Sequence, residues 1–362
     1  MNKVKLGDIA FFGNGATIPK EKGKFPAFGG NGITDFVNLY NTNDDTIIVG
    51  RVGAYCGSVN YFKGRCWITD NALFIKAKQE VDAKFLSQYL KLANLNKVRI
   101  GSSQPLITQG ILSKLEIQLP DFETQTAIAR VLSSLDDKIE LNNKINAALE
   151  KLAKTIYEYW FVQNAEEKWE RKSLRELGEF KNGANYEKAN EIGERVKIVN
   201  VRDISSSSIF IQVENLDKII LPKNEIEKYL LNENDIIFAR SGIPGATRLI
   251  EKTEEDVIFC GFAIRFRLND KNLKDYLFFP LKQNEEFAKN KSGGSIMPNI
   301  SQDSLKEISI TIPPTKTLEK FNKIVSPLFS TIIKNRQESA HLAQLRDFLL
   351  PLLMNGQVTF NP

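Results

Sequence analysis

The chain has 362 residues, a formal net charge of +5 at pH 7 and an isoelectric point near 8.8. This length exceeds the size at which one hydrophobic core stops growing, so two or more domains are expected. Cys56, Cys66 and Cys260 form no C-x-x-C pair, which argues against a zinc site and against a secreted disulfide framework. The single histidine, His341, excludes the usual imidazole metal sites and is interpreted as an ordinary helix residue.

The composition also bears on location. No stretch approaches the roughly 18 uninterrupted apolar residues of a membrane span. The first residues, MNKVKLGDIAFF, lack a signal-type apolar core and a small-residue cleavage site. A cytoplasmic protein that does not associate with membranes is therefore expected. The moderate positive charge permits nucleic-acid binding without demanding it.

The first segment of the chain has a counterpart further on. KLGDIAFFGNGA at 5–16 aligns with SLRELGEFKNGA at 173–184, and Leu6 aligns with Leu174. Because self-similarity is the signature of repeat architectures, the match indicates two copies of one module. The glycine-rich strings at 13–15 and 29–32 are interpreted as turns, because neither lies between a strong strand and a long helix as a phosphate-binding loop would.

Three later segments continue the repeat. DTIIVGRVG at 45–53 matches NDIIFARSG at 234–242, which pairs Arg51 with Arg240. GSSQPLITQ at 101–109 matches GSIMPNISQ at 294–302, and LEIQLP at 115–120 matches ISITIP at 308–313. The offset between the copies grows from 168 to 193, so the second copy carries insertions of about 20 residues. Runs such as TIIVG and FAIRFRL alternate with amphipathic segments such as DAKFLSQYLKL, which predicts an α+β module.

A long helix with a seven-residue apolar period is expected at the end of each copy, after Pro120 and after Pro313-Pro314. Complementary heptad seams pack as a coiled coil, and the intervening globular segment lets the chain return, so an antiparallel pair is expected. The expected seam residues are Leu132, Leu135, Ile139, Asn142, Asn146, Leu149 and Ile156 in the first helix and Val325, Leu328, Ile332, Asn335, Ser339, Leu342 and Leu349 in the second.

Polar residues interrupt both seams at corresponding positions. Asn142 corresponds to Asn335, and Asn146 to Ser339. An unpaired amide in a dry interface costs on the order of 1–3 kcal/mol, so seam amides favour paired contacts that fix register and partner choice. The alternative places these asparagines on a wet surface beside an ordinary core stripe.

These patterns predict an α+β fold with a pseudo-twofold internal repeat, in which two similar globular domains are separated by two long helices that pair as an antiparallel coiled coil. The expected boundaries are residues 1–122 for the first globular domain, 123–163 for the first helix, 164–315 for the second globular domain and 316–362 for the second helix.

No catalytic signature appears in either copy. The sequence has no G-x-x-x-x-G-K-[ST] phosphate loop and no G-x-S-x-G elbow. It also has no Asp/Asn-Pro-Pro-aromatic tetrad of the kind that amino-methyltransferases use, since the nearest string, IPPT at 312–315, lacks the acid or amide and the aromatic residue. No catalytic residue and no metal ligand is therefore expected in this chain.

Lysine and arginine are interleaved with Asn, Ser, Gly and Tyr in loops of both copies. In a DNA groove, Lys and Arg neutralise phosphates, and Arg, Asn or Gln reads base edges. The equivalence of Arg51 and Arg240 singles out these two, whereas any other charge has an ordinary solvated surface residue as its alternative interpretation. The candidate DNA-binding residues are Lys20, Lys22, Lys24, Asn31, Arg51, Tyr55, Lys63, Arg65, Arg99, Ser102, Lys188, Lys197, Asn200, Arg202, Arg240, Ser241, Arg248, Lys291 and Ser295.

The whole chain resembles the specificity (S) subunit of type I restriction–modification enzymes. The resemblance rests on the duplicated openings that end in N-G-A, on the GSSQPLIT and GSIMPNIS loops, and on LEIQLPDFETQTAIARVLSSLDDKIELNNKINAALEKLAKTIYEYWF. The last segment joins a P-x-x-x-x-Q entry to the long helix. The second copy departs from it, with Lys320 or a neighbour where the first copy has Gln125, so a partner contact through Gln125 is expected to be weaker in the second half.

The resemblance implies that each globular domain is a target-recognition domain reading one half of a split DNA sequence, with the helices setting the spacing. It implies two methyltransferase (M) subunits that carry S-adenosylmethionine as partners, and restriction (R) subunits that use ATP and Mg²⁺, in a complex that methylates DNA and defends against phage. No cofactor is expected in this chain. Two alternatives stay open: a self-contained DNA-modifying enzyme with a diverged site, and a coiled-coil scaffold without a nucleic-acid role.

Overall fold

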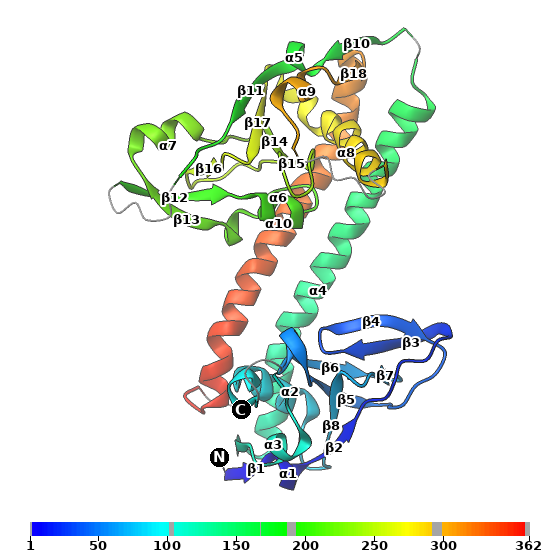
Figure 1. Cartoon of the computed structure of the whole chain (residues 1–362), viewed down its shortest axis with the longest axis vertical. Helices are drawn as coiled ribbons and strands as arrows, with labels where there is room; N and C mark the ends of the chain where they lie inside the picture. Colours follow the sequence, from blue (N-terminus) through cyan, green and yellow to red (C-terminus); the bar gives the residue numbers. More distant parts are fainter. Residues whose placement is uncertain (1, 101–104, 167, 187–192, 292–298, 359–362) are drawn as a thin grey trace. The chain divides into compact units, whose positions relative to one another are not determined.

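The computed structural model describes residues 2–100, 105–166, 168–186, 193–291 and 299–358 (Figure 1). The chain forms two compact units: unit 1 comprises 1–140 and 341–362, and unit 2 comprises 141–340. Each of the two long helices therefore contributes to both units. The division of the chain into four segments by residue number stays a prediction. Every helix within the described ranges is too short or too polar to cross a membrane.

Unit 1 holds a four-stranded sheet of order β2-β8-β5-β6, a three-stranded sheet of order β4-β3-β7 and the strand pair β1-β9. Helix α2 packs on the larger sheet, where Leu86 and Leu90 share a core with Ile47 and Ile75. The elements are β1 (Asn2–Lys5), α1 (Leu6–Ile9), β2 (Ala10–Asn14), β3 (Lys22–Gly29), β4 (Gly32–Val37), β5 (Asp45–Gly50), β6 (Val59–Lys63), β7 (Trp67–Ile68), β8 (Ala72–Ala77), α2 (Ala83–Leu92), α3 (Gln109–Ser113) and β9 (Glu116–Leu119).

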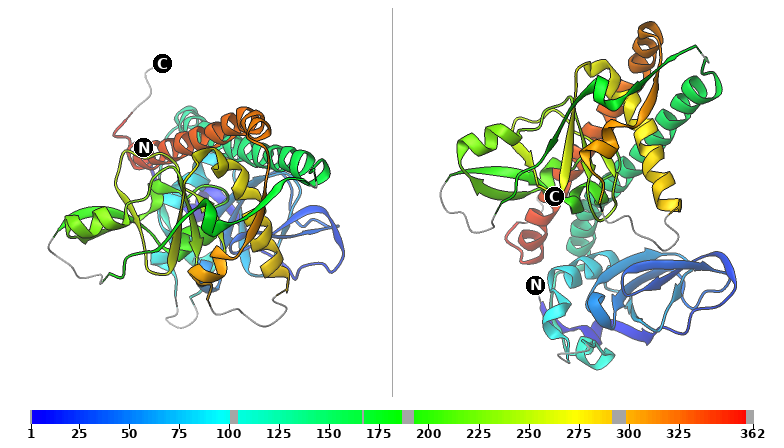
Figure 2. Two further views of the ribbon diagram at one scale, coloured as in Figure 1. Left: turned by 90° about the horizontal axis from the view of Figure 1, so that it is seen from above. Right: turned by 45° about the horizontal axis from the view of Figure 1, so that its top comes forward.

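Unit 2 repeats this topology, with sheets of order β11-β17-β14-β15 and β13-β12-β16 and the strand pair β10-β18. The position of helix α8 in this unit can be followed in Figure 1 and Figure 2. The ring of Phe279 on α8 stacks on Tyr157 of the first long helix and on Phe329 of the second. The elements are β10 (Glu170–Ser173), α5 (Leu174–Leu177), β11 (Gly178–Asn182), β12 (Glu194–Val199), α6 (Val201–Ser206), β13 (Asp217–Leu221), α7 (Lys223–Tyr229), β14 (Asp235–Ala239), β15 (Thr247–Leu249), β16 (Val257–Phe259), β17 (Ala263–Leu268), α8 (Lys274–Lys291), α9 (Gln302–Lys306) and β18 (Ser309–Ile312).

Strand register confirms the internal repeat residue by residue. Lys5 pairs with Glu116 in β1-β9, and their sequence counterparts, Ser173 and Ser309, pair in β10-β18. In both units the smaller sheet contains one antiparallel and one parallel pairing. The expected α+β architecture with two similar domains is therefore confirmed.

The additional residues of the second copy lie mainly in one connection. Between β3 and β4, unit 1 has only Gly30 and Asn31, whereas unit 2 has residues 200–216 between β12 and β13, including α6. The insertion expected from the growing offset is thus placed at the β12–β13 connection, with α7 following after β13.

The two glycine-rich strings of unit 1 have different structures. Residues 29–32 form the expected turn between β3 and β4, with Gly32 at φ +87°. The turn interpretation of 13–15 is wrong, because β2 runs to Asn14 and pairs with β8. A Cβ on Gly15 would lie 1.8 Å from the backbone oxygen of Thr69, so this glycine permits close approach of two backbones.

The two long helices are α4 (Phe122–Glu158) and α10 (Thr315–Met354). A π-helical turn, Tyr159–Gln163, continues α4. The second helix was expected to reach 362, but it ends at Met354. Gly356 adopts φ +66°, and its amide donates to the carbonyl of Leu353, which is the usual way in which glycine ends a helix. Residues 359–362 of the expected helix lie outside the described residues.

Within unit 2 the helices run antiparallel. The rings of Phe161, in the π-helical turn that continues α4, and Phe321 of α10 are 4.9 Å apart. Asn142 of α4 contacts Ser339 of α10. Later residues of the first helix therefore contact earlier residues of the second, as in an antiparallel pair. All fourteen expected seam residues are buried or half-buried in their units. Asn142 is 0% exposed, so the alternative of a wet surface position is wrong for this residue.

Gln125 is a structural residue of unit 1. Its side chain is 1% exposed, accepts from the amide of Asp82 at 2.9 Å and donates to the carbonyl of Pro120 at 2.9 Å. The expectation that Gln125 contacts a partner is therefore wrong. Its side-chain amide forms hydrogen bonds that connect the start of α4 to the residue before α2. At the corresponding position, α10 has buried Leu318.

Candidate nucleic-acid interface

Arg51 and Arg240 occupy the same backbone setting in their units. Each follows a central strand of the four-stranded sheet, β5 or β14. The carbonyl of Arg51 accepts from the amide of Ile107 at 2.9 Å, and the carbonyl of Arg240 accepts from Ile300 at 3.0 Å. The two acceptors and the two donors correspond in the sequence repeat. The matched sequence segments therefore build the same loop twice.

The glycine two residues after each arginine fixes the loop conformation. Gly53 and Gly242 both have φ +74°, a left-handed conformation that residues with a Cβ rarely adopt. This explains the Arg-x-Gly pattern, because the chain turns sharply at the glycine immediately after the arginine leaves the sheet. We call residues 51–53 and 240–242 the Arg-x-Gly loops.

The two arginine side chains are half-buried. Nε of Arg51 is buried without a hydrogen-bond partner in the described structure, whereas Nη1 of Arg240 donates to the carbonyl of Gly261 at 3.2 Å. A guanidinium carries five donors, so both side chains retain donors for a further acceptor. An arginine held in this way suits bidentate contact with a guanine edge or a phosphate.

In unit 1, the β3–β4 turn lies against the Arg-x-Gly loop. The hydroxyl of Ser58 donates to the carbonyl of Gly30, which places the turn bearing Asn31 beside this loop. Tyr55 follows the loop and is 54% exposed. The structure therefore brings together three of the expected residues, Asn31, Arg51 and Tyr55, with an amide, a guanidinium and an aromatic ring available for bases or phosphates.

In unit 2, the β12–β13 connection takes the equivalent place. It starts with Asn200 and α6, and a side chain added at Gly242 would meet Val201 at 3.1 Å. Arg202 is exposed and pairs with Asp217 at 2.5 Å. The expected residues Asn200, Arg202 and Arg240 thus come from two neighbouring connections, as Asn31 and Arg51 do in unit 1.

A hollow of about 480 Å³ adjoins the Arg-x-Gly loop of unit 2. Its walls include Asn185, Tyr186, Asn200 and Arg202, and Phe262 at its edge is 64% exposed. Tyr186 donates to Asn200 at 3.1 Å, and burial raises the pKa of Tyr186, so its hydroxyl stays protonated at neutral pH. The amide of Arg240 donates to the carbonyl of Phe262 at 2.9 Å, which ties the hollow to the loop.

Sequence reasoning missed Asn185, Tyr186 and Phe262. Asn185 and Tyr186 directly follow the repeated Asn-Gly-Ala motif, and Phe262 follows Gly261 in a turn between two strands. An exposed aromatic residue beside arginine and asparagine is suited to stacking on a base. The only sequence signal was the polar and aromatic character of the residues that follow the repeat motifs.

The remaining exposed candidates of unit 1 lie in other contacts. Lys22 pairs with Asp35, and Lys63 lies 3.7 Å from Asp45. Cation–π contacts place Lys24 over Phe25 at 5.4 Å and Arg65 over Tyr40 at 4.9 Å. Lys20 is exposed, and neither it nor these four residues is joined to the Arg-x-Gly loop by these contacts. Arg99 is exposed and lies nearer the loop, because its neighbour Ile100 pairs with Leu106, which in turn pairs with Val52.

The side chains of two candidate DNA-binding residues of unit 2 are largely buried. Arg248 is 2% exposed and bonds to the carboxylate of Glu285 at 3.0 Å, so its expected DNA contact is wrong in this structure. Lys197 pairs with Glu255 at 2.7 Å, and its side chain is 11% exposed. Ser241 is half-buried in the Arg-x-Gly loop. Ser102, Lys188 and Ser295 lie outside the described residues, as does the side chain of Lys291 at the end of α8.

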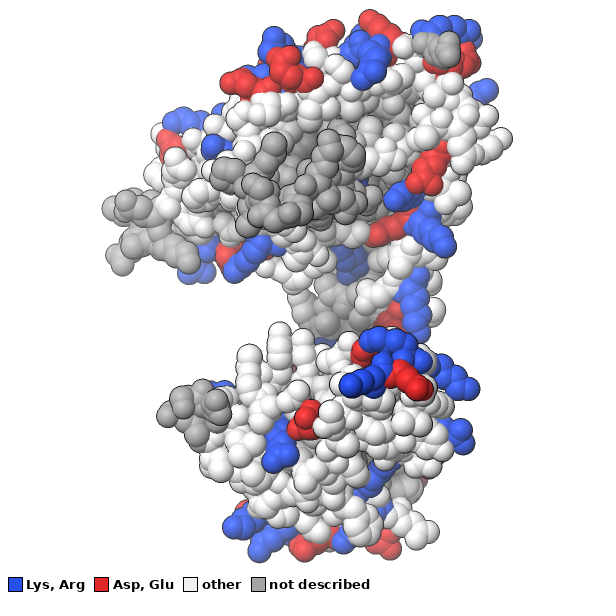
Figure 3. Space-filling model, turned by 45° about the vertical axis from the view of Figure 1, so that its right-hand side comes forward, with Lys and Arg blue, Asp and Glu red and all other residues white. Residues whose placement is uncertain are grey.

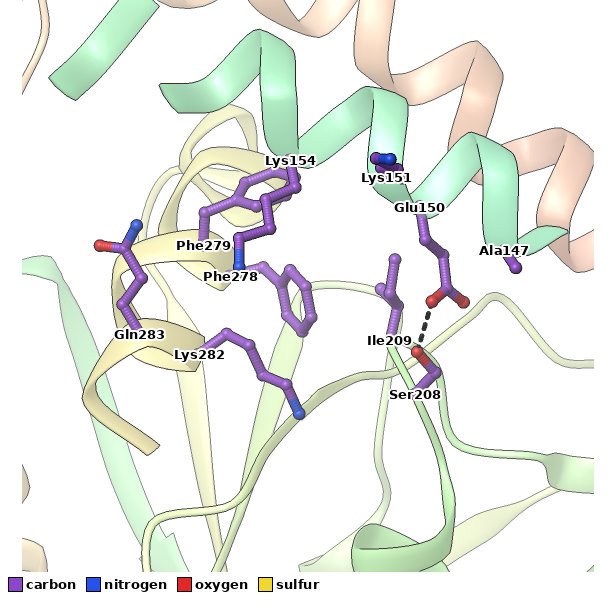
Figure 4. Close-up of a pocket in the computed structure, with 10 residues that line it drawn as sticks. All are labelled: Ala147, Glu150, Lys151, Lys154, Ser208, Ile209, Phe278, Phe279, Lys282 and Gln283. Carbon is purple, nitrogen blue, oxygen red and sulfur yellow. Dashed lines mark hydrogen bonds between the residues drawn. The ribbon is translucent and has the colours of Figure 1, made fainter. Parts of the chain in front are cut away.

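A second hollow of about 340 Å³ lies between α4 and α8 in unit 2 (Figure 4). Phe278, Phe279 and Ile209 form its apolar wall, and Lys154 and Lys282 lie at its rim (Figure 4). This composition suits an apolar side chain more than a nucleic-acid backbone, so we do not include it in the interface. Over the face shown in Figure 3, Lys and Arg are interspersed with Asp and Glu.

Comparison with known proteins identifies the family. The sequence model of the type I restriction modification DNA specificity domain matches residues 1–151 and again 166–344. The chain belongs to this family. The two matches contain the two copies of the repeat and the larger part of each long helix, up to residue 151 of α4 and residue 344 of α10. The chain is accordingly a specificity subunit, and not itself a methyltransferase or a nuclease.

Two relatives show the extent of the similarity. The type I restriction enzyme MjaIX specificity subunit of Methanocaldococcus jannaschii is 30% identical over 303 residues, which cover 76% of this chain and 67% of the relative. The type I restriction enzyme HindI specificity subunit of Haemophilus influenzae is 23% identical over 333 residues, which cover 70% and 71%.

Among solved structures, the chain shares its fold with the S subunit of the type I restriction-modification system from M. genitalium. The TM-score is 0.67 at 19% sequence identity, and the match covers 97% of this chain and 95% of that one. This likeness concerns the fold, in agreement with the duplicated topology.

Proposed function

We propose that this specificity subunit binds double-stranded DNA and reads a split sequence, one half with unit 1 and the other with unit 2. The observation that carries the proposal is the repeated arrangement of an Arg-x-Gly loop beside an asparagine-bearing connection. Arg51 with Asn31 forms it in unit 1, and Arg240 with Asn200 forms it in unit 2. Arginine and asparagine are the side chains that pair most specifically with guanine and adenine edges.

The two arrangements differ in detail, which supports a target without palindromic symmetry. Unit 1 places Tyr55 beside its loop, whereas unit 2 has α6 and the hollow edged by Phe262. Since direct readout depends on which side chains reach the base edges, different side chains on the same backbone frame select different bases. We therefore infer two unlike half-sites.

The proposal includes partner subunits. Two methyltransferase subunits would dock on the helix pair, and restriction subunits would join through the complex. S-adenosylmethionine, ATP and Mg²⁺ would be bound by these partners. A duplicated chain offers two related docking surfaces, which suits two copies of one partner. Because the target is DNA of the cell or of an invading phage, we propose that the complex acts in the cytoplasm.

The experiment that tests the proposal is methylome sequencing of a host that expresses this chain with its methyltransferase subunit. A bipartite motif with unread base pairs in the middle is expected. Arg51→Ala is expected to weaken DNA binding of the complex by roughly 1–3 kcal/mol and to relax or abolish recognition of one half-site, with Arg240→Ala doing the same for the other.

Lys114→Ala and Lys252→Ala serve as matched controls, because both lysines are exposed and lie outside the proposed interface. Either control should leave the methylated motif unchanged. Unaltered recognition of both half-sites in the Arg51 and Arg240 variants would contradict the assignment of these loops. Methylation by the purified chain alone would contradict the division of roles between subunits.

A further inference from the structure

A second apolar stripe runs along α4 and the π-helical turn that continues it, within unit 2 and on a face adjacent to the seam with α10. Its residues recur at intervals of three, four or seven, and its large members are 37–58% exposed. The stripe consists of Leu141, Ile145, Ala148, Leu152, Tyr159 and Val162. An exposed apolar patch of this extent marks an interaction site, and a heptad period is the pattern that accepts another helix.

This stripe is distinct from the seam that pairs the two helices. The seam residues Asn142, Leu149 and Ile156 are buried or half-buried, whereas Leu141, one position before Asn142, is 50% exposed. On a helix, neighbouring residues point about 100° apart, so one helix presents two separate apolar edges. The inner edge is occupied by α10, and the outer edge has no occupant within the described chain.

The repeat supplies a second version of the stripe on α10, but it is less apolar. The positions that correspond to Leu141, Ile145 and Ala148 hold Lys334, Glu338 and His341, all exposed. The apolar character returns only further along, at Leu345, which is 45% exposed, and Phe348, which is 65% exposed. The chain therefore carries two related stripes of unequal apolar length.

The charges beside the α4 stripe indicate its occupant. Lys144 and Lys151 lie seven residues apart on α4, beside the stripe, and both are exposed; Glu158, seven residues further on the same edge, is paired with Lys154 at 4.0 Å. A partner helix with an apolar seam and an acidic flank would complement this edge. Because related stripes occur twice on one chain, a partner present in two copies fits better than a second copy of this chain.

We propose that the α4 stripe is the tighter of two docking faces for such a helix of the methyltransferase subunit, so that the two subunits bind in order, first on α4 and then on α10. This inference rests on the proposed function, and it adds the order of assembly. The physical reason is that docking on the α4 stripe would bury apolar residues along its whole length, whereas docking on the first half of the α10 stripe would bury the charged Lys334 and Glu338.

The test titrates the full-length chain with its methyltransferase subunit and measures both binding steps by calorimetry and native mass spectrometry. The wild-type chain should show two steps whose dissociation constants differ by at least tenfold. Leu152→Ser with Tyr159→Ser should weaken the tighter step at least tenfold. Leu345→Ser with Phe348→Ser should weaken only the weaker step and leave the 1:1 complex intact.

A gain-of-affinity variant completes the design. Lys334→Leu with His341→Ala makes the α10 stripe resemble the α4 stripe and should narrow the gap between the steps. All substituted side chains are exposed, so unchanged thermal unfolding of the free chain should accompany each result. Glu338 is left in place, because it accepts a hydrogen bond from Asn142.

Three outcomes would overturn the inference. Equal affinities for the two steps would do so, as would equal weakening of both steps by the two serine pairs. Self-association of the chain through the α4 stripe, lost in the Leu152→Ser and Tyr159→Ser variant, with equal methyltransferase steps, would assign the stripe to a second copy. Absence of any methyltransferase binding by the wild-type chain would contradict the proposed function itself.

Discussion

Asn335 donates from Nδ2 to Oδ1 of Asn146 at 2.9 Å in the middle of the helix pair. A second bond, from Nδ2 of Asn142 to Oγ of Ser339, has a length of 3.2 Å. Asn142 corresponds to Asn335 in the repeat, and Ser339 corresponds to Asn146. The two hydrogen bonds are therefore formed by corresponding pairs of residues and are related by the pseudo-twofold symmetry. A shift of one helix along the other would break both, and the polar layer therefore fixes the register.

Replacing Asn142 and Asn335 together is expected to affect thermal stability and helix register in different ways. In Asn142→Leu with Asn335→Leu, the melting temperature should stay equal or rise, because the buried and unpartnered Oδ1 of Asn142 is removed and apolar contact is gained. Register should loosen, which analytical ultracentrifugation would detect as additional association states.

Asn143→Ala, an exposed neighbour, is the control and should change neither property. A double variant that melts lower than the wild-type chain and keeps its association state would show that the layer does not set the register.

Gln125 offers a test of how unit 1 holds the start of α4. Gln125→Ala removes the bonds to Asp82 and Pro120 and leaves a half-buried amide and a buried carbonyl unsatisfied. The free energy of unfolding should fall by about 1–3 kcal/mol in urea titration. Thr126→Ala, at an exposed position of the same turn, should have a much smaller effect. Equal effects of the two variants would refute the structural role of Gln125.

The ion pair of Arg336 with Glu251 predicts a pH-dependent variant. The two groups lie 2.5 Å apart in unit 2, Glu251 is 4% exposed, and burial raises the pKa of this carboxyl above its ordinary value. Arg336→Met leaves the carboxylate buried beside Glu214 without its cation. The free energy of unfolding at pH 8 should fall by about 3–5 kcal/mol.

The direction with pH follows from the raised pKa. The folded state holds a proton on Glu251 at pH values where the unfolded state has lost it, so stability falls as pH rises through that interval. The Arg336→Met variant should therefore recover stability as the pH is lowered from 8 towards 5. Adding Glu251→Gln should abolish this dependence. A variant equally unstable at both pH values would contradict the account.

The repeat and the helix pair could be predicted because each leaves a pattern in the sequence itself, namely similar segments in the two halves and a seven-residue apolar period. Leu135 and Leu149 recur on one position of a seven-residue seam, and Arg51 and Arg240 share an Arg-x-Gly pattern whose glycines require the same positive φ. Such signals do not depend on knowing which distant segments meet. The matching seam interruptions at Asn142 and Asn335 likewise predicted the contact between the helices.

Burial of individual charges could not be predicted in this way. Arg248 looked like a surface arginine, but it lies on β15 and meets Glu285 of α8, 37 residues away. Tyr186 and Phe262 reach the candidate interface from separate segments that only the fold brings together. The sequence predicts a partner contact for Gln125, because it does not show that Asp82 and Pro120 satisfy the side-chain amide of this residue.

We propose that the helix pair sets the spacing between the two half-sites that units 1 and 2 read. Leu132 and Trp160 are 28 residues apart, which corresponds to about 42 Å of helix and to roughly 12 base pairs of DNA. We expect half-site centres roughly 10–12 base pairs apart, so that both meet one face of the duplex. A four-residue insertion in only one helix should break the polar register and disrupt assembly.

The most direct test is the methylome of a chain with one heptad inserted in each helix, between Glu140 and Leu141 and between Ala340 and His341, expressed with its methyltransferase subunit. The insertions keep the seam and add about 10 Å, or roughly 3 base pairs. The account predicts the same two half-sites with an unread spacer longer by that amount, even if changed helical phase slows methylation. Methylation at the original spacing by the assembled variant would contradict it.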